Sequence, residues 1–255
     1  MCLLLISFYT HPEYPLIVAA NRDEFYNRPT EKVHFWKEHP DLIAGKDLEA
    51  GGTWLGITKT GRFAAVTNYR DMNSIKKNAS SRGELVTNFL LSRESPLIYG
   101  RSLSKKADEY NGYNLLFSDI KTLYYFSNQT RQLTQLSAGV YGLSNHLLDT
   151  PWQKVVRSKE AFRDVTSSKK ILTDDLFKIL SDETEAPDDQ LPETGLSKEL
   201  EKAVSPVFIK SENYGTRSST VLLINKMKGV LFIEKSLETK TKLWSESKFE
   251  FNLEQ

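Results

Sequence analysis

The sequence predicts an α+β protein in which two β-sheets are sandwiched between two layers of helices. Three observations support this fold class. Short apolar runs bounded by turn residues, which are typical of strands, occur in groups near the start, the middle and the end of the chain. Segments with helix-start signals and helical periodicity occur as two pairs between these groups. The 255 residues can bury a core between such layers, and we expect one domain over residues 1–255.

The first two strands are predicted by the apolar runs LLLISF and PLIVAAN, which the turn-rich THPEY joins. These runs are typical of a buried hairpin, in which Cys2 begins a central strand. The segment from Tyr26 to Gly52 has weak periodicity and many turn-forming residues, so we expect a long surface loop of a kind that often carries function. The next segment, GGTWLGITKTGRFAAVTNY, predicts a second hairpin that turns at Gly61.

Two helices and four strands are expected in the middle of the chain. Ser81 and Glu84, followed by the apolar stripe of LVTNFLL, predict a helix that begins with a capping box. Ser95 and Pro96 predict the start of a second helix, which ends near Asn111. Four short strands follow, with the sequences YNLLFSD, TLYYFSN, RQLTQL and VYGLSN.

The last third of the chain predicts two more helices and a final group of strands. Thr150 and Pro151 begin a helix that runs to about Val165, and DDLFKILS forms the next helix. The acidic, proline-containing DETEAPDDQLPET is typical of a loop and not of a linker between domains. A last hairpin and an edge strand are predicted by TRSSTVLLIN, GVLFIEKSL and KFEFNL.

The composition excludes several classes of partner. With 34 Lys and Arg residues against 33 Asp and Glu residues, the chain has no electrostatic footprint for nucleic acid. The apolar run at residues 3–6 is too short to span a bilayer, and no basic segment precedes it as in a signal peptide. A single cysteine cannot form an internal disulfide. We therefore expect a cytoplasmic protein without a transmembrane segment, with organelle association an open alternative if the source is eukaryotic.

The common metal and cofactor motifs are absent from the sequence. There is no GxxxxGK phosphate loop, no GxGxxG and no CxxC, and the four histidines lack the spacing of a metal site. We expect no metal site and no covalently attached haem. His34 and His39 lie in the predicted surface loop, where solvated histidines are more common than ligands, and contact with a bound ligand is the alternative.

The position of Cys2 is the main chemical signal. Methionine is normally removed when the second residue is small, which would leave Cys2 as the first residue with a free α-amine. The thiol would then carry its own base, because an α-amine with a pKa of about 8 is nearly matched to neutral pH. The alternative is an incidental cysteine at a frayed terminus, which a place in a core strand disfavours.

Polar residues at the end of the second predicted strand are candidate partners of the thiol. If the strand continues through Asn21, Arg22, Asp23 and Glu24, then Asn21 and Asp23 share one face, and Arg22 and Glu24 share the other. These residues form either a salt-bridged strand end or a charged pair that orients the amine of Cys2.

Three further polar residues stand beside predicted strands. Asn68 and Asn145 each follow a short apolar strand, where an asparagine either begins a turn or points its amide N–H at a developing oxyanion. Arg217 lies where a predicted turn passes into a strand, and its position alone does not indicate a functional role.

Several separated motifs together resemble one family over nearly the whole chain. They are, in order, MC, AANRDEFYNRP, GGTWLGI, the strand of Asn68, RGELV, YNGYN, YGLSN with DTPWQK, and YGTRSST. They resemble the NRDE family, which contains transport and Golgi organisation protein two and its bacterial relatives. The resemblance implies a single NRDE-family domain with the four-layer αββα sandwich of the N-terminal-nucleophile hydrolases. This fold is similar in outline to that of bile-salt hydrolases and penicillin V acylases, which cut linear amides with an N-terminal cysteine.

The same resemblance implies roles for particular residues. Cys2 looks like the nucleophile of those acylases, Asn68 and Asn145 look like their oxyanion and amine-holding asparagines, and Arg217 looks like their late arginine. The second strand departs from their R-x-x-D pattern.

In the second predicted strand, Asn21 and Glu24 stand at the two ends of the R-x-x-D spacing, with Arg22 and Asp23 between them. The pair that positions the nucleophile is therefore expected to be rearranged.

Two functional hypotheses follow, and a third is an inactive scaffold. The first is a cysteine amidohydrolase or thioesterase that acts on an acyl ligand and requires no cofactor. The second is a carrier that holds haem or an acyl-CoA in the same cleft without cleaving it, because the family is associated with haem mobilisation and with acyl-CoA and lipid homeostasis. In the second case haem is a transported ligand.

Overall fold

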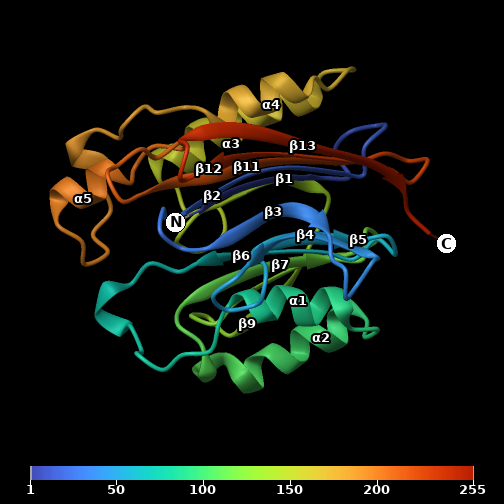
Figure 1. The fold of residues 1–255 in the computed structure, drawn as a ribbon, viewed down its shortest axis with the longest axis horizontal. Coiled ribbons are helices and arrows are strands. Elements are labelled where there is room, and N and C mark those ends of the chain that lie inside the picture. Colours follow the sequence, from blue (N-terminus) through green and yellow to red (C-terminus); the bar gives the residue numbers. More distant parts are fainter. Residues whose placement is uncertain (1, 255) are drawn as a thin grey trace.

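The computed structural model describes residues 2–254 as four layers (Figure 1). Helices α3 and α4 cover one face of a six-stranded sheet, and the other face of this sheet packs on a seven-stranded sheet. Helices α1 and α2 cover the far face of the second sheet. This arrangement confirms the predicted sandwich of two sheets between helices.

Every strand pairing within the two sheets is antiparallel. The first sheet has the order β10-β1-β2-β11-β12-β13, with β1 (Cys2–Phe8), β2 (Leu16–Phe25), β10 (Gly139–Leu143), β11 (Tyr214–Ile224), β12 (Gly229–Glu238) and β13 (Leu243–Asn252). The second sheet follows the chain, with β3 (Thr30–Phe35), β4 (Leu42–Asp47), β5 (Leu55–Thr58), β6 (Phe63–Asn68), β7 (Tyr113–Ser118), β8 (Leu123–Ser127) and β9 (Gln132–Leu136).

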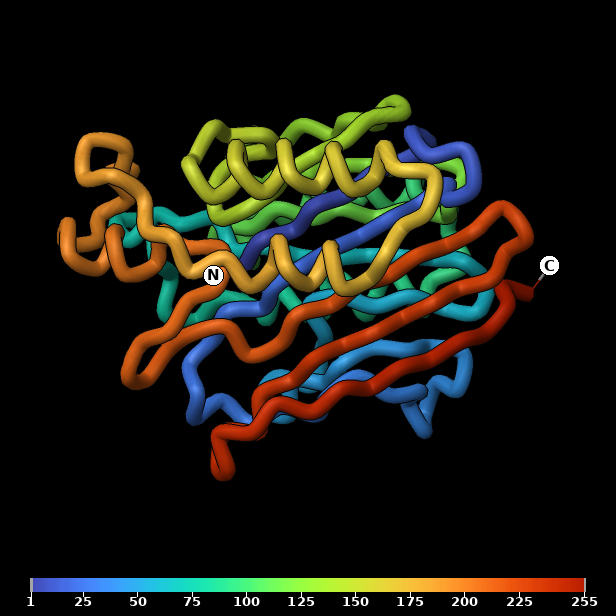
Figure 2. The backbone as a smooth tube through the Cα atoms, turned by 90° about the horizontal axis from the view of Figure 1, so that it is seen from above, coloured from blue at the N-terminus to red at the C-terminus, as the bar shows by residue number. Residues whose placement is uncertain are grey.

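Five α-helices and three 3₁₀ helices complete the described chain. The α-helices are α1 (Gly83–Leu91), α2 (Pro96–Leu103), α3 (Gln153–Ser167), α4 (Thr173–Leu180) and α5 (Lys198–Ala203). The 3₁₀ helices are η1 (Met72–Ser74), η2 (Ser104–Glu109) and η3 (Asp188–Gln190). Figure 2 shows α3 and α4 side by side over the first sheet. No helix within residues 2–254 is long and apolar enough to cross a membrane.

Alternation along the strands divides the core into three apolar clusters. In β1, Leu4 and Ile6 pack between the two sheets, while Leu3 and Leu5 pack under α3 and α4. A third cluster lies between the second sheet and the α1 and α2 layer. Full burial of one such side chain contributes about 1.5–3 kcal/mol to folding.

The structure contains both predicted N-terminal hairpins. β1 pairs with β2 over its whole length and lies between β2 and β10, so Cys2 begins an interior strand as predicted. β5 and β6 form the second hairpin, and Gly61 takes a φ of 83° in its turn.

The prediction of a long surface loop from Tyr26 to Gly52 was wrong. This segment contains β3 and β4, which form one edge of the second sheet. Only Val33 is fully buried in β3, and the pairing with β4 is irregular between Glu31 and His34. An edge strand with one buried side chain has weak alternation, which explains why the sequence pattern missed it.

Two details of the helices also differ from the prediction. α1 is present, but Ser81 forms no capping box, because Arg82 is the N-cap residue and makes no side-chain capping bond. The Glu84 carboxylate instead accepts a hydrogen bond from the Tyr110 hydroxyl (2.5 Å). Helix α5 was not predicted, since its sequence KELEKA has no apolar stripe and buries only Glu201.

Candidate active site

Cys2 lies at the start of β1, at one end of the space between the two sheets. Its side chain has the same parity as Leu4 and therefore faces the second sheet. It lines a cleft of about 340 Å³ together with Asn68 at the end of β6 and Arg82 at the start of α1. As a whole residue Cys2 is half-buried.

Asn145 fixes the start of β1 against the end of β6. Its Oδ1 accepts a hydrogen bond from the backbone N–H of Cys2 (3.3 Å), and its Nδ2 donates to the backbone carbonyl of Asn68 (2.9 Å). Ser144 adds a hydrogen bond from its hydroxyl to the carbonyl of Cys2 (3.0 Å). Asn145 is fully buried. Both ends of its carboxamide are engaged by these two bonds, which position Cys2 and Asn68.

Asn68 presents the free amide of this site. Its side chain is half-buried, lines the Cys2 cleft and makes no hydrogen bond with any residue from 2 to 254. The amide N–H is therefore available to an oxygen atom of a ligand.

A larger cavity of about 920 Å³ adjoins the Cys2 cleft. The two share the lining residues Glu24, Arg28, Asn68, Arg82 and Asn111. Basic side chains of the larger cavity are Arg28, Arg70, Lys76, Arg82 and Arg131. Apolar and aromatic side chains there include Phe25, Tyr69, Ile75, Tyr110, Leu196 and Leu200. The lining also includes the acidic residues Glu24, Asp71 and Asp108, and the side chains of Arg28, Arg70 and Arg131 are paired with Asp47, Glu201 and Asp108. Lys76 and Arg82 form no ion pair within residues 2–254, so these two can bind an anionic group of a ligand whose apolar part contacts the rest of the lining.

The polar residues of β2 alternate between the two faces of the sheet, as predicted. Asn21 faces the helical layer, where its Nδ2 donates to the carbonyls of Leu180 (2.8 Å) and Val207 (2.9 Å). Its Oδ1 accepts from the Ser219 hydroxyl (2.7 Å). With all of these groups engaged behind the sheet, Asn21 does not reach the Cys2 cleft.

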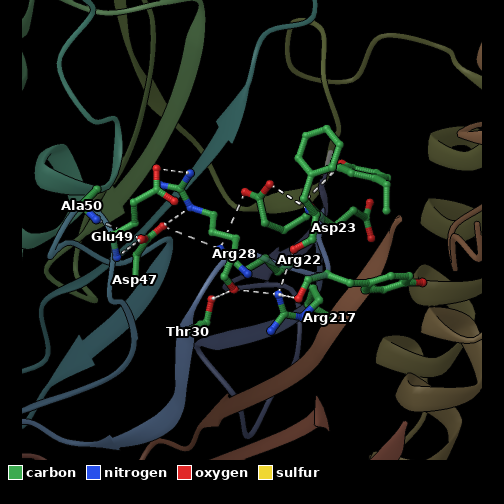
Figure 3. A network of polar contacts seen from close by, with 12 residues as sticks. Arg22, Asp23, Arg28, Thr30, Asp47, Glu49, Ala50 and Arg217 are labelled. Atoms are coloured by element: carbon green, nitrogen blue, oxygen red, sulfur yellow. Dashed lines mark hydrogen bonds and ion pairs between the residues drawn. The ribbon is translucent and has the colours of Figure 1, made fainter. Parts of the chain in front are cut away.

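Arg22 and Glu24 face the other sheet. The Arg22 guanidinium lies over the ring of Trp54 at 4.3 Å from the centroid. Its Nη2 is 3.7 Å from Glu24 Oε2 and 3.8 Å from Asp47 Oδ2. Arg28 also binds Asp47, at 2.7 Å (Figure 3). These charges form the wall of the Cys2 cleft.

Asp23 lies on the face opposite to Arg22 and also borders the cleft. Its Oδ1 accepts a hydrogen bond from the Thr216 hydroxyl (2.7 Å). Burial raises the pKa of Asp23, while the positive charges of Lys154 and Arg22 act in the opposite direction.

Arg217 is not brought to Cys2. Its Nη1 donates to the backbone carbonyls of Phe25 (2.9 Å) and Arg28 (3.0 Å) in the connection from β2 to β3 (Figure 3). The side chain lines a different cavity, which lies on the other side of Arg22 and Trp54. Arg217 therefore holds this connection and does not line the Cys2 cleft.

Lys154 is a residue near the site that the sequence analysis missed. It lies in the first turn of α3, is 4% exposed, and donates from Nζ to the carbonyl of Val204 (2.8 Å). Burial lowers its pKa to about 8, although the negative charge of Asp23 opposes this shift. The available signal was its position in the motif DTPWQK, but a lysine on a polar helix gives no sign of burial.

Burial also raises the pKa of the Cys2 thiol, and the charge of Asp23 acts in the same direction. Nucleophilic attack by Cys2 at neutral pH therefore needs a base that accepts the thiol proton. Among residues 2–254 no group of three or more His, Cys, Asp or Glu side chains is arranged to hold a metal ion.

A family model described as Transport and Golgi organisation 2 matches residues 1–239. The Transport and Golgi organization 2 homolog of Mus musculus is 35% identical over 280 residues, with all of both chains covered. The chain belongs to the Transport and Golgi organisation 2 family. The homolog of Bos taurus is 36% identical over 276 residues, again with both chains fully covered. The Drosophila melanogaster protein of this name is 27% identical, over 93% of this chain and 92% of its own.

A solved structure shows the fold class of this family member. A conjugated bile acid hydrolase from Clostridium perfringens, in a mutant form, matches with a TM-score of 0.53 and 9% sequence identity. The match covers 99% of this chain and 92% of the hydrolase. It confirms the predicted αββα fold of the N-terminal-nucleophile hydrolases.

In this member of the Transport and Golgi organisation 2 family, the fold gathers most of the predicted site residues. Cys2, Arg22, Asp23, Glu24 and Asn68 line one cleft, and Asn145 binds the backbone of Cys2 from behind. The two exceptions are Asn21, which faces the helices, and Arg217, which lines another cavity.

Proposed function

We propose that this protein binds an acyl amide or an acyl thioester in the Cys2 cleft and cleaves it through Cys2. The observation that supports this proposal is that Asn145 accepts a hydrogen bond from the Cys2 N–H and donates one to the Asn68 carbonyl, and so holds together two residues that line the same cleft. A nucleophile and an oxyanion donor in one cleft are the minimum that acyl transfer requires.

The proposed reaction begins when removal of Met1 frees the α-amine of Cys2. The amine takes the thiol proton as Sγ bonds to the carbonyl carbon, and the carbonyl oxygen becomes negative beside the amide of Asn68. The bond to the leaving nitrogen or sulfur then breaks, and that atom takes the proton from the amine. Water attacks the remaining acyl thioester, which releases a carboxylic acid and restores the thiol.

The larger cavity is the proposed site for the rest of the ligand. Its apolar side chains would contact an acyl chain, and its basic side chains would bind carboxylate or phosphate groups. Substrates with both parts, such as long-chain acyl-CoA thioesters and N-acyl amino acids, are therefore the first to test.

The experiment measures turnover of these two substrate classes, after intact-mass analysis has established that Met1 is absent. We expect turnover, a Cys2 acyl adduct visible by mass spectrometry, and loss of both in Cys2→Ala. Cys2→Ser is the matched control, because it keeps the amine and a weaker nucleophile and should retain slow turnover. Equal turnover by Cys2→Ala and the unmodified chain would contradict the proposal.

Carriage of haem or an acyl-CoA without cleavage is the second candidate. It is supported by the direction of Asn21, because the residue at the first position of the R-x-x-D spacing faces away from the cleft. A thiol without its full set of partners can hold a ligand without turning it over.

Titrations with haem and with palmitoyl-CoA distinguish the two candidates. Carriage predicts saturable binding, intact ligand after prolonged incubation, and unchanged affinity in Cys2→Ala. Arg82→Gln, which removes a basic group from the Cys2 cleft and from the larger cavity, should weaken the binding of both ligands. Release of free acid that depends on Cys2 would exclude simple carriage.

A further inference from the structure

A second cavity of about 740 Å³ lies between the two sheets at the edge formed by β3. Arg22 and Trp54 line both this cavity and the Cys2 cleft, and they form the partition between them. The remaining wall comes from β3, β4, β11, β12 and β13, and from Lys37, Glu38 and Leu48 in the connections that follow β3 and β4. This second cavity plays no part in the function proposed above.

Three residues that line the second cavity each carry a buried donor with no hydrogen-bond partner among residues 2–254. The donors are Arg22 Nη1, Arg217 Nε and Ser218 Oγ, on side chains that are 6%, 8% and 4% exposed. A buried polar group without a partner lowers stability and is rare in folded proteins, so three such groups at one cavity form an unusual concentration. Arg217 and Ser218 line this cavity and not the Cys2 cleft.

The two arginines carry like charges at close range. Burial lowers the pKa of Arg217, and the charge of Arg22 lowers it further. Nη2 of Arg22 is directed to Glu24 and Asp47, but at 3.7 and 3.8 Å these contacts are long for charge-assisted hydrogen bonds. A negative charge between the two guanidinium groups would relieve their repulsion.

Glu234, a buried acidic group on the wall of the second cavity, is already engaged. Glu234 accepts hydrogen bonds from the backbone N–H of Val33 (2.8 Å) and from the hydroxyls of Ser236 (2.8 Å) and Thr220 (3.4 Å). Burial raises the pKa of Glu234, while these hydrogen bonds and the charge of Arg22 act in the opposite direction. The other charged or titratable lining groups are Glu31, Lys32, His34, Lys37, Glu38, Lys46 and Glu238, a mixture of both signs.

We propose that the second cavity is an anion site, in which Arg22, Arg217 and Ser218 bind the carboxylate or phosphate group of a small molecule. The planar guanidinium groups match the oxygen geometry of both anions, and the serine hydroxyl supplies a third donor. The site is separate from the Cys2 cleft and shares only the Arg22 and Trp54 partition with it.

The test is isothermal titration of the full chain with inorganic phosphate and with succinate. We expect saturable binding of one anion per chain, with the preferred probe identifying the phosphate or carboxylate source. Ser218→Ala should weaken binding about tenfold, the effect of one hydrogen bond to a charged group. Arg217→Gln should weaken it more, but loss of its bonds to backbone carbonyls also threatens the fold, so Ser218→Ala is the decisive variant.

Arg82→Gln is the matched control, because it removes a cation from the Cys2 cleft and from the larger cavity while leaving the second cavity intact. Its affinity for the anion should be unchanged. A selenate-soaked crystal should show anomalous density within hydrogen-bond distance of Ser218. Absence of saturable binding to the folded chain, or binding that Arg82→Gln weakens and Ser218→Ala does not, would overturn the proposal.

Discussion

Asn145 determines where Cys2 lies, because one buried carboxamide binds both the Cys2 N–H and the Asn68 carbonyl. Asn145→Leu keeps the side-chain volume but leaves both backbone groups unpaired. Each buried unpaired group costs about 1–3 kcal/mol, so for two groups we expect a loss of roughly 2–6 kcal/mol in the free energy of unfolding. Asn145→Asp, which keeps an acceptor for Cys2 N–H, should lose less. Urea unfolding of the three chains measures this, and equal stability of Asn145→Leu would contradict it.

Lys154 should give the stability of the protein a particular pH dependence. Its folded-state pKa of about 8 lies below the ordinary 10.5, so the unfolded chain binds more protons between these two values. The free energy of unfolding should therefore gain a contribution that rises with pH from about 8 to about 10.5. Below pH 8 the buried charge lowers stability by about 3 kcal/mol relative to an unshifted lysine.

Lys154→Met tests this pH dependence. The variant should be more stable than the unmodified chain at pH 7, and the difference should shrink as the pH rises to 10. Urea unfolding at pH 7, 8, 9 and 10 gives the comparison. Lys169→Met, at an exposed position just after α3, is the control and should leave the pH profile unchanged. Parallel profiles for Lys154→Met and the unmodified chain would refute the assignment.

At the scale of elements, α1 is positioned by a close backbone approach to the GGTW segment. A Cβ at Gly52 would lie 2.6 Å from the backbone carbon of Gly83, at the first residue of α1. A Cβ at Gly51 would meet nothing within 4 Å, although its φ of 78° is unfavourable for other residues. The two neighbouring glycines are therefore needed for different reasons.

Alanine substitutions separate these two reasons. Gly51→Ala should cost about 1–2 kcal/mol, which is the strain of a left-handed residue. Gly52→Ala should cost more, because α1 must move, and it should also displace Arg82 from the Cys2 cleft. Thermal unfolding compares stabilities, and the reactivity of the Cys2 thiol toward a maleimide reports on the cleft. A larger effect of Gly51→Ala on both readouts would contradict the packing argument.

Elements with strong patterns were predictable from the sequence, and elements shaped by tertiary contacts were not. The β1–β2 hairpin has two continuous apolar runs, and α2 begins with Ser95 and Pro96, so local chemistry specified both. β3 is stabilised by its pairing with β4 and by the burial of one residue, Val33. The capping box did not form, because Arg82 is the N-cap residue of α1, and the Glu84 carboxylate binds the hydroxyl of Tyr110, which is distant in the sequence.

At the scale of the whole molecule, the four layers could be predicted from the order of strands and helices along the chain. The residues that make up the site could be predicted only in part. Alternation along β2 correctly separated Asn21 and Asp23 from Arg22 and Glu24. The sequence does not show which face meets the cleft, so Asn21 was included and Lys154 was missed. Arg217 lies at an irregularity in the pairing of β11 with β2, which simple alternation cannot anticipate.

Glu234 connects the two sheets at the open edge of the sandwich. It lies on β12 of the first sheet, and its Oε1 accepts a hydrogen bond from the Val33 N–H on β3 of the second sheet (2.8 Å). Glu234→Ala should leave this N–H unpaired, lower the free energy of unfolding by about 1–3 kcal/mol and accelerate hydrogen exchange at Val33.

Glu234→Gln distinguishes the hydrogen bond from the charge. Glutamine keeps an acceptor for Val33 and removes a buried carboxylate whose pKa is raised by burial, so stability at neutral pH should equal or exceed that of the unmodified chain. In the unmodified chain, acidification through the raised pKa should increase stability, because the folded state binds the proton more tightly than the unfolded state. Glu234→Gln should lack this increase. Slow exchange at Val33 in the glutamine variant and fast exchange in the alanine variant would establish that this one hydrogen bond holds the sheet edges together, whereas equally fast exchange in both would show that it does not.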